Sequence, residues 1–463
     1  MNITVIGTGY LGAVHAACMA QIGHAVLGVD ADTEKRDLLA QGGVPFFEPG
    51  LGEMLNRTVQ SRALRFSASL AEAAEFGEVH FICVGTPQLP GSFAADTSSV
   101  EAVIKDLAPL LRRDCLVVGK STVPVGTAAR MASRLAGLAP AGSGAELAWN
   151  PEFLREGYAV RDTLQPDRVV AGVTSARSDA ILRSVYAPIL AAGTPFIATD
   201  LQTAELVKVA ANAFLATKIS FINAMADVCA AADADIVTLT RALGHDSRIG
   251  HRGMAAGLGF GGGCLPKDLR ALLARGGELG VGESLRILRE VERINASRRV
   301  RTVEIATNLA GGSWTDQNVA ILGASFKPET DDVRESPALA VAVEIAAAGA
   351  CVRVHDPRAA DNARALHPEL EYAPDVEKAC ADADIVLHLT EWPQYREIDP
   401  VALRGFVRQP VLLDARNVLA LSRWQAAGWT VRGLGVRNRG TPAAGPAPAG
   451  RAAGDQEGTC GSR

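Results

Sequence analysis

Short apolar runs alternate with helix-like stretches along the first part of the chain. Apolar runs at 2–6 and 25–29 flank an alanine-rich stretch at 14–22, and further runs follow at 78–84 and 115–120. Continuous apolar runs of this length are typical of strands buried on both faces of a parallel sheet. The pattern therefore predicts a doubly wound α/β domain over residues 1–200, with helices on both faces of the sheet.

A long segment with few helix breakers comes next. It runs from Leu201 to about Ala232 and is rich in alanine, and a shorter helical segment covers 282–307. A segment of this length predicts one long helix that joins two halves of the molecule. We assign residues 201–300 to a central helical region, which also carries a glycine-rich loop.

The α/β pattern restarts near residue 318. It consists of four apolar runs and one helix-like stretch, at 318–323, 351–355, 384–389, 411–414 and 337–348. The order of strand, turn, helix, strand and aspartate resembles that at the start of the chain, which predicts a second doubly wound domain over 301–436. The remaining residues, 437–463, are mostly Gly, Ala and Pro and predict a disordered tail.

Composition narrows the function classes. The net charge is −5 and basic residues form no runs, which argues against a nucleic-acid partner. We find no apolar run of membrane-spanning length and no room for a signal peptide before the first strand, so we expect neither a membrane segment nor secretion. The eight cysteines form no CxxC pair and have no metal-ligand spacing, which predicts reduced thiols in a cytoplasmic protein without a metal site.

The first strand is followed by a glycine motif, Gly7-Thr8-Gly9-Tyr10-Leu11-Gly12. It stands between a strand and a helix, and Asp30 ends the next strand, which is the context that a dinucleotide-binding turn requires. The glycines allow the tight turn and the close approach of a pyrophosphate. Asp30 would bind ribose hydroxyls and repel a 2′-phosphate, so NAD is favoured over NADP. Two Rossmann-like domains joined by a long central helix are thus the predicted architecture.

Polar turn residues follow two later strands. Thr86 and Thr122 both lie at carboxyl ends of predicted strands, where open α/β sheets bind their ligands. Hydroxyl groups there can hold a phosphate, a ribose or a water. The alternative is ordinary turn chemistry, because Thr and Pro are common turn formers.

The most informative stretch of the chain is 259–268, which reads GFGGGCLPKD. It places Cys264 at the end of a glycine run and at the start of a predicted helix, with Pro266 in the first turn. Backbone N–H groups and the helix dipole favour a thiolate at such a place, and the thiolate is the nucleophilic form. The alternative is a glycine-rich turn with a buried, inert cysteine.

Two further pairs carry candidate chemistry. Glu152 and Glu156 are carboxylates four residues apart, and either could act as a general base; a solvated helix face is the alternative. Lys208 and Asn212 share one face of the long apolar helix. A buried lysine needs a partner or a task, although Lys208 could also extend to the surface.

Taken together, the motifs resemble the UDP-glucose/GDP-mannose dehydrogenase family from Met1 to about Val436. The resemblance rests on Asp30 and on motifs that occur in the family's order: GTGYLG, VGTP, STVPVGT, NPEFLREG, ELVKVAANAFLA, SRIG, GFGGGCLPKD, FKPETDDVRESP and DARN. The family oxidises the primary alcohol of a nucleotide sugar to a carboxylate in two steps, with two NAD⁺. The resemblance implies two Rossmann-like domains, a long central helix and a homodimer.

The resemblance also implies catalytic roles. Cys264 matches the nucleophile that holds the aldehyde as a thiohemiacetal and then as a thioester. Lys208 matches the lysine that stabilises the oxyanion, and Asp268 matches its acidic partner. Asn212 matches an oxyanion or sugar contact, Glu152 the base of thioester hydrolysis, and Thr122 a hydroxyl that positions water.

Binding roles follow in the same way. The implied cofactor contacts are Gly7, Gly9, Tyr10, Leu11, Gly12, Asp30, Lys35, Thr86, Thr122, Glu156 and Arg334. The implied substrate contacts are Glu152, Phe153, Leu154, Lys208, Asn212, Arg248, Phe260, Gly261, Lys327 and Arg416. Arg248 matches an arginine that reaches the substrate bound to the partner subunit.

The substrate implied by the resemblance is UDP-glucose, which SRIG followed by AGLGFGG favours. Position 263 is Gly where the family usually has Ser. Position 265 is Leu, which also occurs in GDP-mannose enzymes, so GDP-mannose remains the alternative substrate. A non-catalytic protein that binds NAD or a nucleotide is the alternative from another class.

Overall fold

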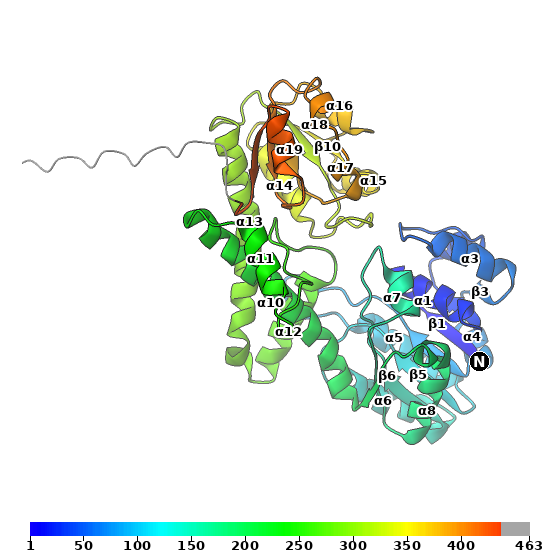
Figure 1. Ribbon diagram of the computed structural model, residues 1–463. Coiled ribbons are helices and arrows are strands. Elements are labelled where there is room, and N and C mark those ends of the chain that lie inside the picture. Colours follow the sequence, from blue (N-terminus) through cyan, green and yellow to red (C-terminus); the bar gives the residue numbers. More distant parts are fainter. Residues whose placement is uncertain (437–463) are drawn as a thin grey trace, which may run out of the picture.

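The computed structural model describes residues 1–436, so the predicted tail at 437–463, with Cys460, lies outside the described residues. Two sheets stand at opposite ends of the molecule, and a long helix runs between them (Figure 1). Each sheet is covered by helices, so the predicted fold class, two doubly wound domains joined by a long central helix, is confirmed.

The N-terminal sheet has eight strands in the order β3-β2-β1-β4-β5-β6-β7-β8. All neighbours pair in parallel except β6 and β7, which are antiparallel at Trp149 and Gly172. The bounds are β1 Asn2–Ile6, β2 Ala25–Val29, β3 Leu64–Ser67, β4 Val79–Ile82, β5 Cys115–Gly119, β6 Ala145–Trp149, β7 Val169–Gly172 and β8 Phe196–Thr199. Strands β4 and β5 are buried along their whole length, which explains their continuous apolar sequences.

Nine helices accompany this sheet within the described part of the chain. They are α1 Tyr10–Gln21, α2 Thr33–Ala40, α3 Leu51–Gln60, α4 Leu70–Phe76, α5 Ser98–Leu107, α6 Thr127–Leu138, α7 Ala159–Leu164, α8 Ala176–Val185 and α9 Ala187–Ala191. Helix α1 begins four residues before the predicted stretch at 14–22, directly after Gly9. It is buried on nearly every side between Gly12 and Ala20, so no amphipathic period marks its true start.

The order of the strands reverses between β1 and β4. One βαβ series extends from β1 towards β3, and the other extends from β4 towards β6. The crossovers leave in opposite directions at this point and open a crevice at the carboxyl ends of both strands. The glycine turn after β1 and the turn after β4 therefore lie where a dinucleotide binds in folds of this kind.

The central region consists of four helices, α10 Leu201–Ala231, α11 Ile236–Gly244, α12 Leu265–Glu278 and α13 Arg286–Leu309. Helix α10 is long and apolar enough to cross a membrane by length and composition alone. It packs against α12 and α13 and also touches β7 and α6. It carries the buried charged residues Glu205 and Lys208 and runs between the two domains (Figure 1).

The second sheet is parallel throughout, in the order β11-β10-β9-β12-β13-β14. Its strands are β9 Asn318–Leu322, β10 Cys351–His355, β11 Glu371–Tyr372, β12 Ile385–His388, β13 Val411–Asp414 and β14 Thr430–Gly433. Its helices are α14 Pro337–Ala347, α15 Ala360–Leu366, α16 Val376–Cys380, α17 Pro393–Arg396, α18 Pro400–Leu403 and α19 Leu421–Ala426. The reversal between β9 and β12 gives this domain a ligand crevice of its own.

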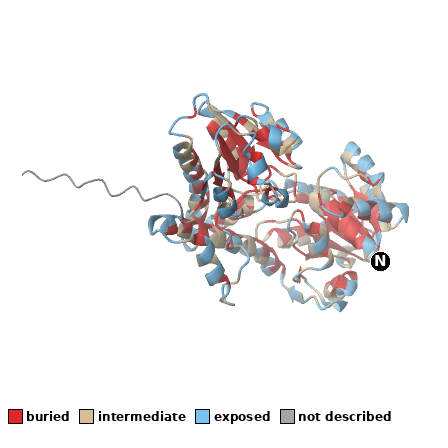
Figure 2. Ribbon diagram, turned by 45° about the horizontal axis from the view of Figure 1, so that its top comes forward, coloured by how far each residue is buried: buried red, intermediate tan, exposed pale blue. Residues whose placement is uncertain are grey.

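Buried residues concentrate in the two sheets and the helices that cover them (Figure 2). The N-terminal core lies on both faces of the first sheet, and another core lies under α14 on the second sheet. Small apolar clusters hold α10 to α11, α12 and α13. Each sheet is thus a rigid support from which turns and loops project into the region between the domains.

Candidate active site

The glycine turn after β1 has the shape that a dinucleotide requires. Gly7 has φ +87°, and a Cβ on Gly12 would lie 1.8 Å from the carbonyl oxygen of Gly7. A Cβ on Gly9 would meet nothing within 4 Å, so open space lies before the first turn of α1. A pyrophosphate can enter that space and accept hydrogen bonds from the N–H groups at the N-terminus of the helix. The residues present therefore fit NAD.

Asp30 ends β2 beside this turn. Its carboxylate accepts hydrogen bonds from the backbone N–H of Thr8 at 2.7 Å and forms an ion pair with Lys35 at 2.9 Å. Burial opposes ionisation, but hydrogen bonds from the N–H of Asp32, from Lys35 and from Thr8 prevail and lower the pKa of Asp30. The group is thus a fixed anion at the predicted ribose position, and Lys35, another predicted cofactor contact, is held there by it.

The turns after β4 and β5 are joined to each other. The hydroxyl of Thr86 donates to the carbonyl oxygen of Thr122 at 2.7 Å. Both residues therefore lie at the carboxyl edge of the first sheet, close to the crevice, where they were predicted to be.

Lys208 and Glu152 form a buried ion pair. Lys208 Nζ lies 2.8 Å from Glu152 Oε1, and only 4% of the lysine side chain is exposed. Burial favours the neutral forms, but the attraction between the two groups prevails: the pKa of Glu152 is lowered and that of Lys208 is raised. The lysine therefore does not extend to the surface. A candidate base and a candidate oxyanion ligand stand in contact, both ionised.

Asp268 is the centre of a second buried set. Its side chain is 2% exposed and accepts hydrogen bonds from Asn212 Nδ2 and from Lys267 Nζ, each at 2.7 Å. Asn212 comes from α10 and Asp268 from the first turn of α12. The pair therefore ties the helix that carries Lys208 to the helix that follows Cys264.

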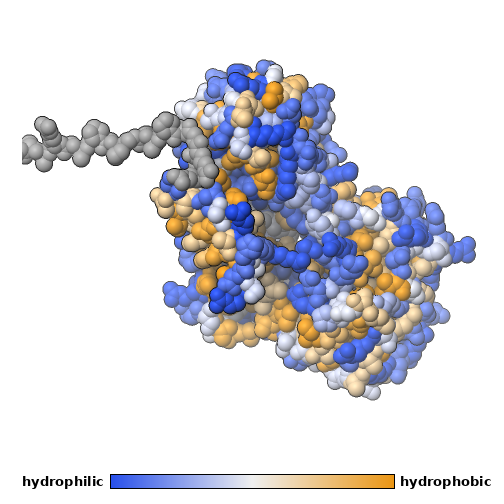
Figure 3. Space-filling view, in the orientation of Figure 1, coloured by the Kyte–Doolittle hydropathy of each residue, from blue (hydrophilic) through white to orange (hydrophobic). Residues whose placement is uncertain are grey.

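Cys264 is the residue that immediately precedes α12, in its N-cap position. Its thiol is free, and the residue as a whole is exposed although surrounding atoms desolvate the sulfur. Charges from three parts of the chain act on it, those of Glu152, Lys208 and Asp268. The surface of the molecule is hollowed where the two domains meet (Figure 3). A nucleophile, a lysine and carboxylates thus share one interdomain site.

The predicted preference of Cys264 for the thiolate form is wrong for the free protein. Surrounding atoms desolvate the thiol and Glu152 repels a negative charge, which together raise its pKa to about 12. Lys208 acts in the opposite direction but does not outweigh them. A helix N-terminus favours an anion only by a modest amount, and nearby carboxylates cancel it.

Glu156 connects the two domains. Its carboxylate lies 3.4 Å from Arg334 and accepts a hydrogen bond from Thr330 at 3.2 Å, and its carbonyl oxygen accepts one from Lys327. Burial and the charge of Asp332 raise the pKa of Glu156 to about 7. The predicted contacts Glu156, Arg334 and Lys327 therefore meet at the domain junction.

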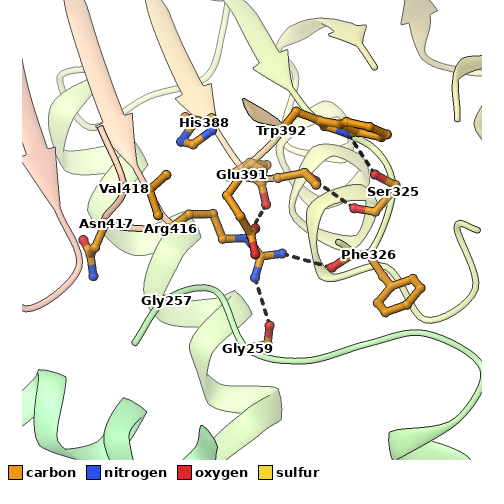
Figure 4. A network of polar contacts seen from close by, with 12 residues as sticks. Gly257, Gly259, Ser325, Phe326, His388, Glu391, Trp392, Arg416, Asn417 and Val418 are labelled. Carbon is orange, nitrogen blue, oxygen red and sulfur yellow. Dashed lines mark hydrogen bonds and ion pairs between the residues drawn. The ribbon is translucent and has the colours of Figure 1, made fainter. Parts of the chain in front are cut away.

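The glycine loop before Cys264 is held by the second domain (Figure 4). Arg416 donates to the carbonyl oxygens of Leu389 at 2.6 Å, Gly259 at 3.1 Å and Phe326 at 3.3 Å, and pairs with Glu391 at 3.1 Å. Arg416 was predicted to contact substrate. Within the chain its guanidinium connects two strand ends of the second domain with the loop that leads to the nucleophile.

Phe260 and Gly261 follow in the same loop. Asn295 of α13 holds Phe260 through both backbone groups, at 2.8 and 2.9 Å. A Cβ on Gly261 would lie 2.1 Å from the carbonyl oxygen of Glu335, so only glycine allows this approach of the second domain. Both predicted substrate contacts therefore form part of the wall between the domains.

Phe153 and Leu154 lie on the loop that carries Glu152. Phe153 packs under the guanidinium of Arg168 at 3.9 Å and beside Lys208 at 5.8 Å. The backbone N–H of Leu154 donates to the Glu152 carboxylate at 2.6 Å. These contacts fix the orientation of the candidate base.

Arg248 lies apart from this cluster. It follows α11, its side chain is 87% exposed, and its hydrogen bonds and ion pair go to Asp246. Within one chain the structure does not bring it into contact with the residues around Cys264.

Sequence reasoning missed three buried polar groups at the site. Lys120, at the end of β5, donates to Asn150 Oδ1 at 3.1 Å, and desolvation lowers its pKa to about 8. Glu205 accepts the N–H groups of Gly126 and Ala128 at the start of α6. Glu48 binds backbone N–H groups next to Glu156. A lysine directly after an apolar strand was a usable signal, whereas Glu205 and Glu48 stood in unremarkable sequence.

Among residues 1–436 no three His, Cys, Asp or Glu side chains lie together in a way that could hold a metal ion.

A dinucleotide crevice, a second nucleotide-type domain and a cysteine between them define a dinucleotide-dependent oxidoreductase. The chain belongs to the UDP-glucose/GDP-mannose dehydrogenase family. The family's NAD binding domain matches residues 1–190, its central domain 202–297 and its UDP binding domain 320–421. NAD is thus the cofactor and a UDP-sugar the kind of substrate that the family's domains indicate.

Known relatives agree along almost the whole chain. UDP-glucose 6-dehydrogenase of Pseudomonas aeruginosa is 42% identical over 444 residues, which cover 94% of this chain and 97% of that protein. The solved UDP-glucose dehydrogenase of Pyrobaculum islandicum superposes with a TM-score of 0.84 at 36% identity, covering 92% and 98% of the two chains. The solved GDP-mannose dehydrogenase of Pseudomonas aeruginosa has a TM-score of 0.52 at 28% identity, covering 91% and 97%.

Proposed function

We propose that this protein is an NAD-dependent UDP-glucose 6-dehydrogenase, which oxidises the primary alcohol of UDP-glucose to the carboxylate of UDP-glucuronate. The observation that carries the proposal is the convergence of Cys264, the Lys208–Glu152 ion pair and the Asn212–Asp268 pair between the two domains. The relatives named for this activity support the choice of sugar.

The chemistry follows from these groups. Bound NAD⁺ accepts a hydride in each of the two oxidations. Between them, the Cys264 sulfur adds to the aldehyde carbon to give a thiohemiacetal, whose oxidation leaves a thioester. Water then attacks the thioester, and the thiolate leaves with the carboxylate as product. Because the aldehyde stays bound to sulfur, it is not released between the two oxidations.

The buried side chains supply the remaining functions. Lys208 stabilises the oxyanion at the sugar carbon, and Asn212 donates a second hydrogen bond, oriented by Asp268. Glu152 accepts the proton of the attacking water, and Thr122 positions that water. The low pKa of Glu152 keeps it ionised at neutral pH, as a base must be.

Initial rates of NADH formation with a panel of nucleotide sugars test the proposal. We expect UDP-glucose to be oxidised with two NADH formed per sugar and no free aldehyde. Preferential oxidation of GDP-mannose, the alternative that Leu265 leaves open, would replace this substrate assignment. Binding of NADH and UDP without turnover of any sugar would establish the non-catalytic alternative.

Replacement of the nucleophile tests the covalent step. Cys264→Ala should form little or no uronate and still bind NADH with near-normal affinity, because the cofactor turn lies elsewhere. Cys264→Ser should accumulate an ester, since an alkoxide leaves less readily than a thiolate. Product analysis by mass spectrometry distinguishes these results, and uronate formation near the wild-type rate by Cys264→Ala would overturn the mechanism.

A homodimer in which Arg248 reaches the partner's substrate is part of the proposal. The exposed side chain of Arg248 supports it, as do large apolar side chains uncovered on α10: Phe214 is 67% exposed and Phe221 51%. Hybrid dimers of Arg248→Ala and Cys264→Ala chains should keep about half the wild-type activity per dimer, since one complete site survives. Hybrids no more active than the two parent variants would refute the cross-subunit role.

The domain assignment completes the proposal. We assign NAD binding to residues 1–200, dimerisation and the Cys264 loop to 201–300, and UDP-sugar binding to 301–436. The protein would act in the cytoplasm, and the free thiols of the described cysteines are compatible with that compartment.

A further inference from the structure

Glu48 is a buried carboxylate that the proposed chemistry does not use. It lies between α2 and α3, it is 5% exposed, and it forms no ion pair among the described residues. Its oxygens accept the backbone N–H groups of Gly157 and Ala159, each at 2.7 Å, and the hydroxyl of Tyr10. Burial raises its pKa, and the hydrogen bonds from Tyr10 and the backbone oppose that rise. An acceptor of this kind holds several donors in one arrangement.

The groups that donate to Glu48 come from two segments, the start of the cofactor helix α1 and the end of the loop that carries Glu152. Tyr10 is the first residue of α1, directly after Gly9 of the dinucleotide turn. Gly157 ends the loop that carries Glu152 and Glu156, and Ala159 is the first residue of α7. Glu48 therefore fixes the far end of the catalytic loop to the start of the cofactor helix.

The residue next to Glu48 reaches the other domain. The backbone N–H of Phe47 donates to the Asp331 carboxylate at 3.0 Å, and the guanidinium of Arg358 lies 4.3 Å from the centre of the Phe47 ring. The side-chain amide of Asn362 donates to the carbonyl oxygen of Asp331 at 2.8 Å. Asp331 and Arg358 both belong to the second doubly wound domain.

Gly157 makes a second contact between the domains, in addition to that of Phe47 with Asp331. Gly157, with φ +77°, packs so closely on the second domain that a Cβ there would lie 2.3 Å from the carbonyl oxygen of Glu329. The residue that Glu48 holds is thus the same residue that the second domain touches. Residues 47–48 and Gly157 together form a bridge, the 47–48 bridge, between the cofactor turn and the second domain.

We propose that Glu48 is a positioning residue that couples the two nucleotide sites through the 47–48 bridge. This coupling rests on the proposed function only because it requires that one domain binds NAD and the other binds UDP. The first ligand to bind orders the bridge, and this ordering costs free energy. The second ligand then binds to a bridge that is already ordered and does not bear this cost, so NADH and UDP bind with positive cooperativity. Glu48 is not in contact with Cys264 or with the reacting carbon of the sugar in the proposed mechanism. It acts through the positions of Tyr10 and Gly157.

Calorimetric titration of the full-length protein tests the coupling directly. NADH is titrated alone and in the presence of saturating UDP, and UDP alone and with saturating NADH. For the wild type we expect each ligand to lower the Kd of the other by the same factor, of about fivefold or more. Equal Kd values with and without the second ligand would overturn the proposal.

Three variants locate the coupling. Glu48→Gln and Asp331→Ala should each reduce the coupling factor to near one, while the Kd of each ligand alone changes by less than about threefold. Tyr10→Phe, which removes only the hydroxyl, should reduce it partly. Glu53→Gln and Asp361→Asn, at exposed positions on α3 and α15, are matched controls that should retain the full factor.

A purely structural role for Glu48 predicts a different result. It would lower the melting temperature and leave the coupling factor unchanged, which contradicts the proposal. Should Glu48→Gln fail to fold, Asp331→Ala and Tyr10→Phe still decide it, because retention of the full factor by both would refute the bridge. The titrations need no turnover, so their outcome is separate from whether UDP-glucose is oxidised.

Discussion

The guanidinium carbon of Arg334 lies 2.5 Å from the place that a Cβ on Gly263 would occupy. Arg334 comes from the second domain and also pairs with Glu156 of the first, 3.4 Å away. The absence of a side chain at 263 therefore lets an arginine of one domain pack against the residue before the nucleophile and reach a carboxylate of the other.

A serine at position 263 should displace this arginine. In Gly263→Ser we expect the KM for NAD⁺ to rise severalfold, because Arg334 loses its position beside the predicted cofactor site, with kcat changed less. The melting temperature should change little, since an exposed arginine can move. Gly137→Ser, on the surface of α6 with nothing near its Cβ, is the control. An unchanged KM for NAD⁺ would show that this contact is incidental.

Loss of the buried lysine should be severe. Lys208→Met leaves the Glu152 carboxylate without its cation, and we expect kcat/KM to fall by at least about 10²-fold, as when an oxyanion ligand is removed. The acid limb of the pH–rate profile should also move to higher pH, because Lys208 contributes most among the groups that lower the pKa of the buried Glu152. Lys105→Met, exposed on α5, should match the wild type. A fall in rate with an unmoved acid limb would mean that Glu152 is not the titrating base.

The thiol of Cys264 should react slowly in the free protein. Because burial and Glu152 raise its pKa to about 12, only a small fraction is thiolate at neutral pH. In a Cys351→Ser/Cys460→Ser background, which removes the other exposed described cysteine and that of the tail, alkylation of Cys264 should accelerate about tenfold per pH unit up to about pH 10. A plateau below pH 8 would contradict the raised pKa.

Glu205 should make stability depend on pH. Burial raises its pKa from 4.5 to about 7, so the folded protein binds this proton more tightly than the unfolded chain. The contribution to stability is therefore fully present below about pH 4.5 and is lost as pH rises through about 7. The melting temperature of Glu205→Gln relative to wild type should increase from pH 5 to pH 8. A difference that is constant over this range would refute the assignment.

Asp30 should set the cofactor preference. Its carboxylate is an anion at the predicted ribose position, so kcat/KM with NAD⁺ should exceed that with NADP⁺ by at least about 10²-fold, equivalent to a few kcal/mol. Asp30→Ala should reduce the ratio mainly through weaker use of NAD⁺. Equal efficiency of both cofactors in the wild type would refute the claim.

Several strands that are buried on both faces were predictable, although β6 and β7, which are also buried, were not predicted. β1, β2, β10 and β13 have the predicted bounds, because continuous apolar runs between turn residues leave little choice of register. β8, whose middle residues are exposed, and β11, of two residues, gave no such pattern. The start of α1 was also missed, because a helix buried on all sides has no polar face to mark its ends.

The sequence by itself determined the candidate chemistry: the glycine turn with Asp30, the cysteine before a helix, and the Lys208–Asn212 face, since each depends on residue types at short spacing. Only the tertiary structure decided what these groups do to one another. The ion pair of Lys208 with Glu152 joins residues 56 positions apart, and the carboxylates that raise the pKa of Cys264 come from other elements. The hydrogen bonds of Glu48 with Tyr10 and Gly157 were likewise not predictable, because long-range contacts, burial and the electrostatic field arise only when the chain folds.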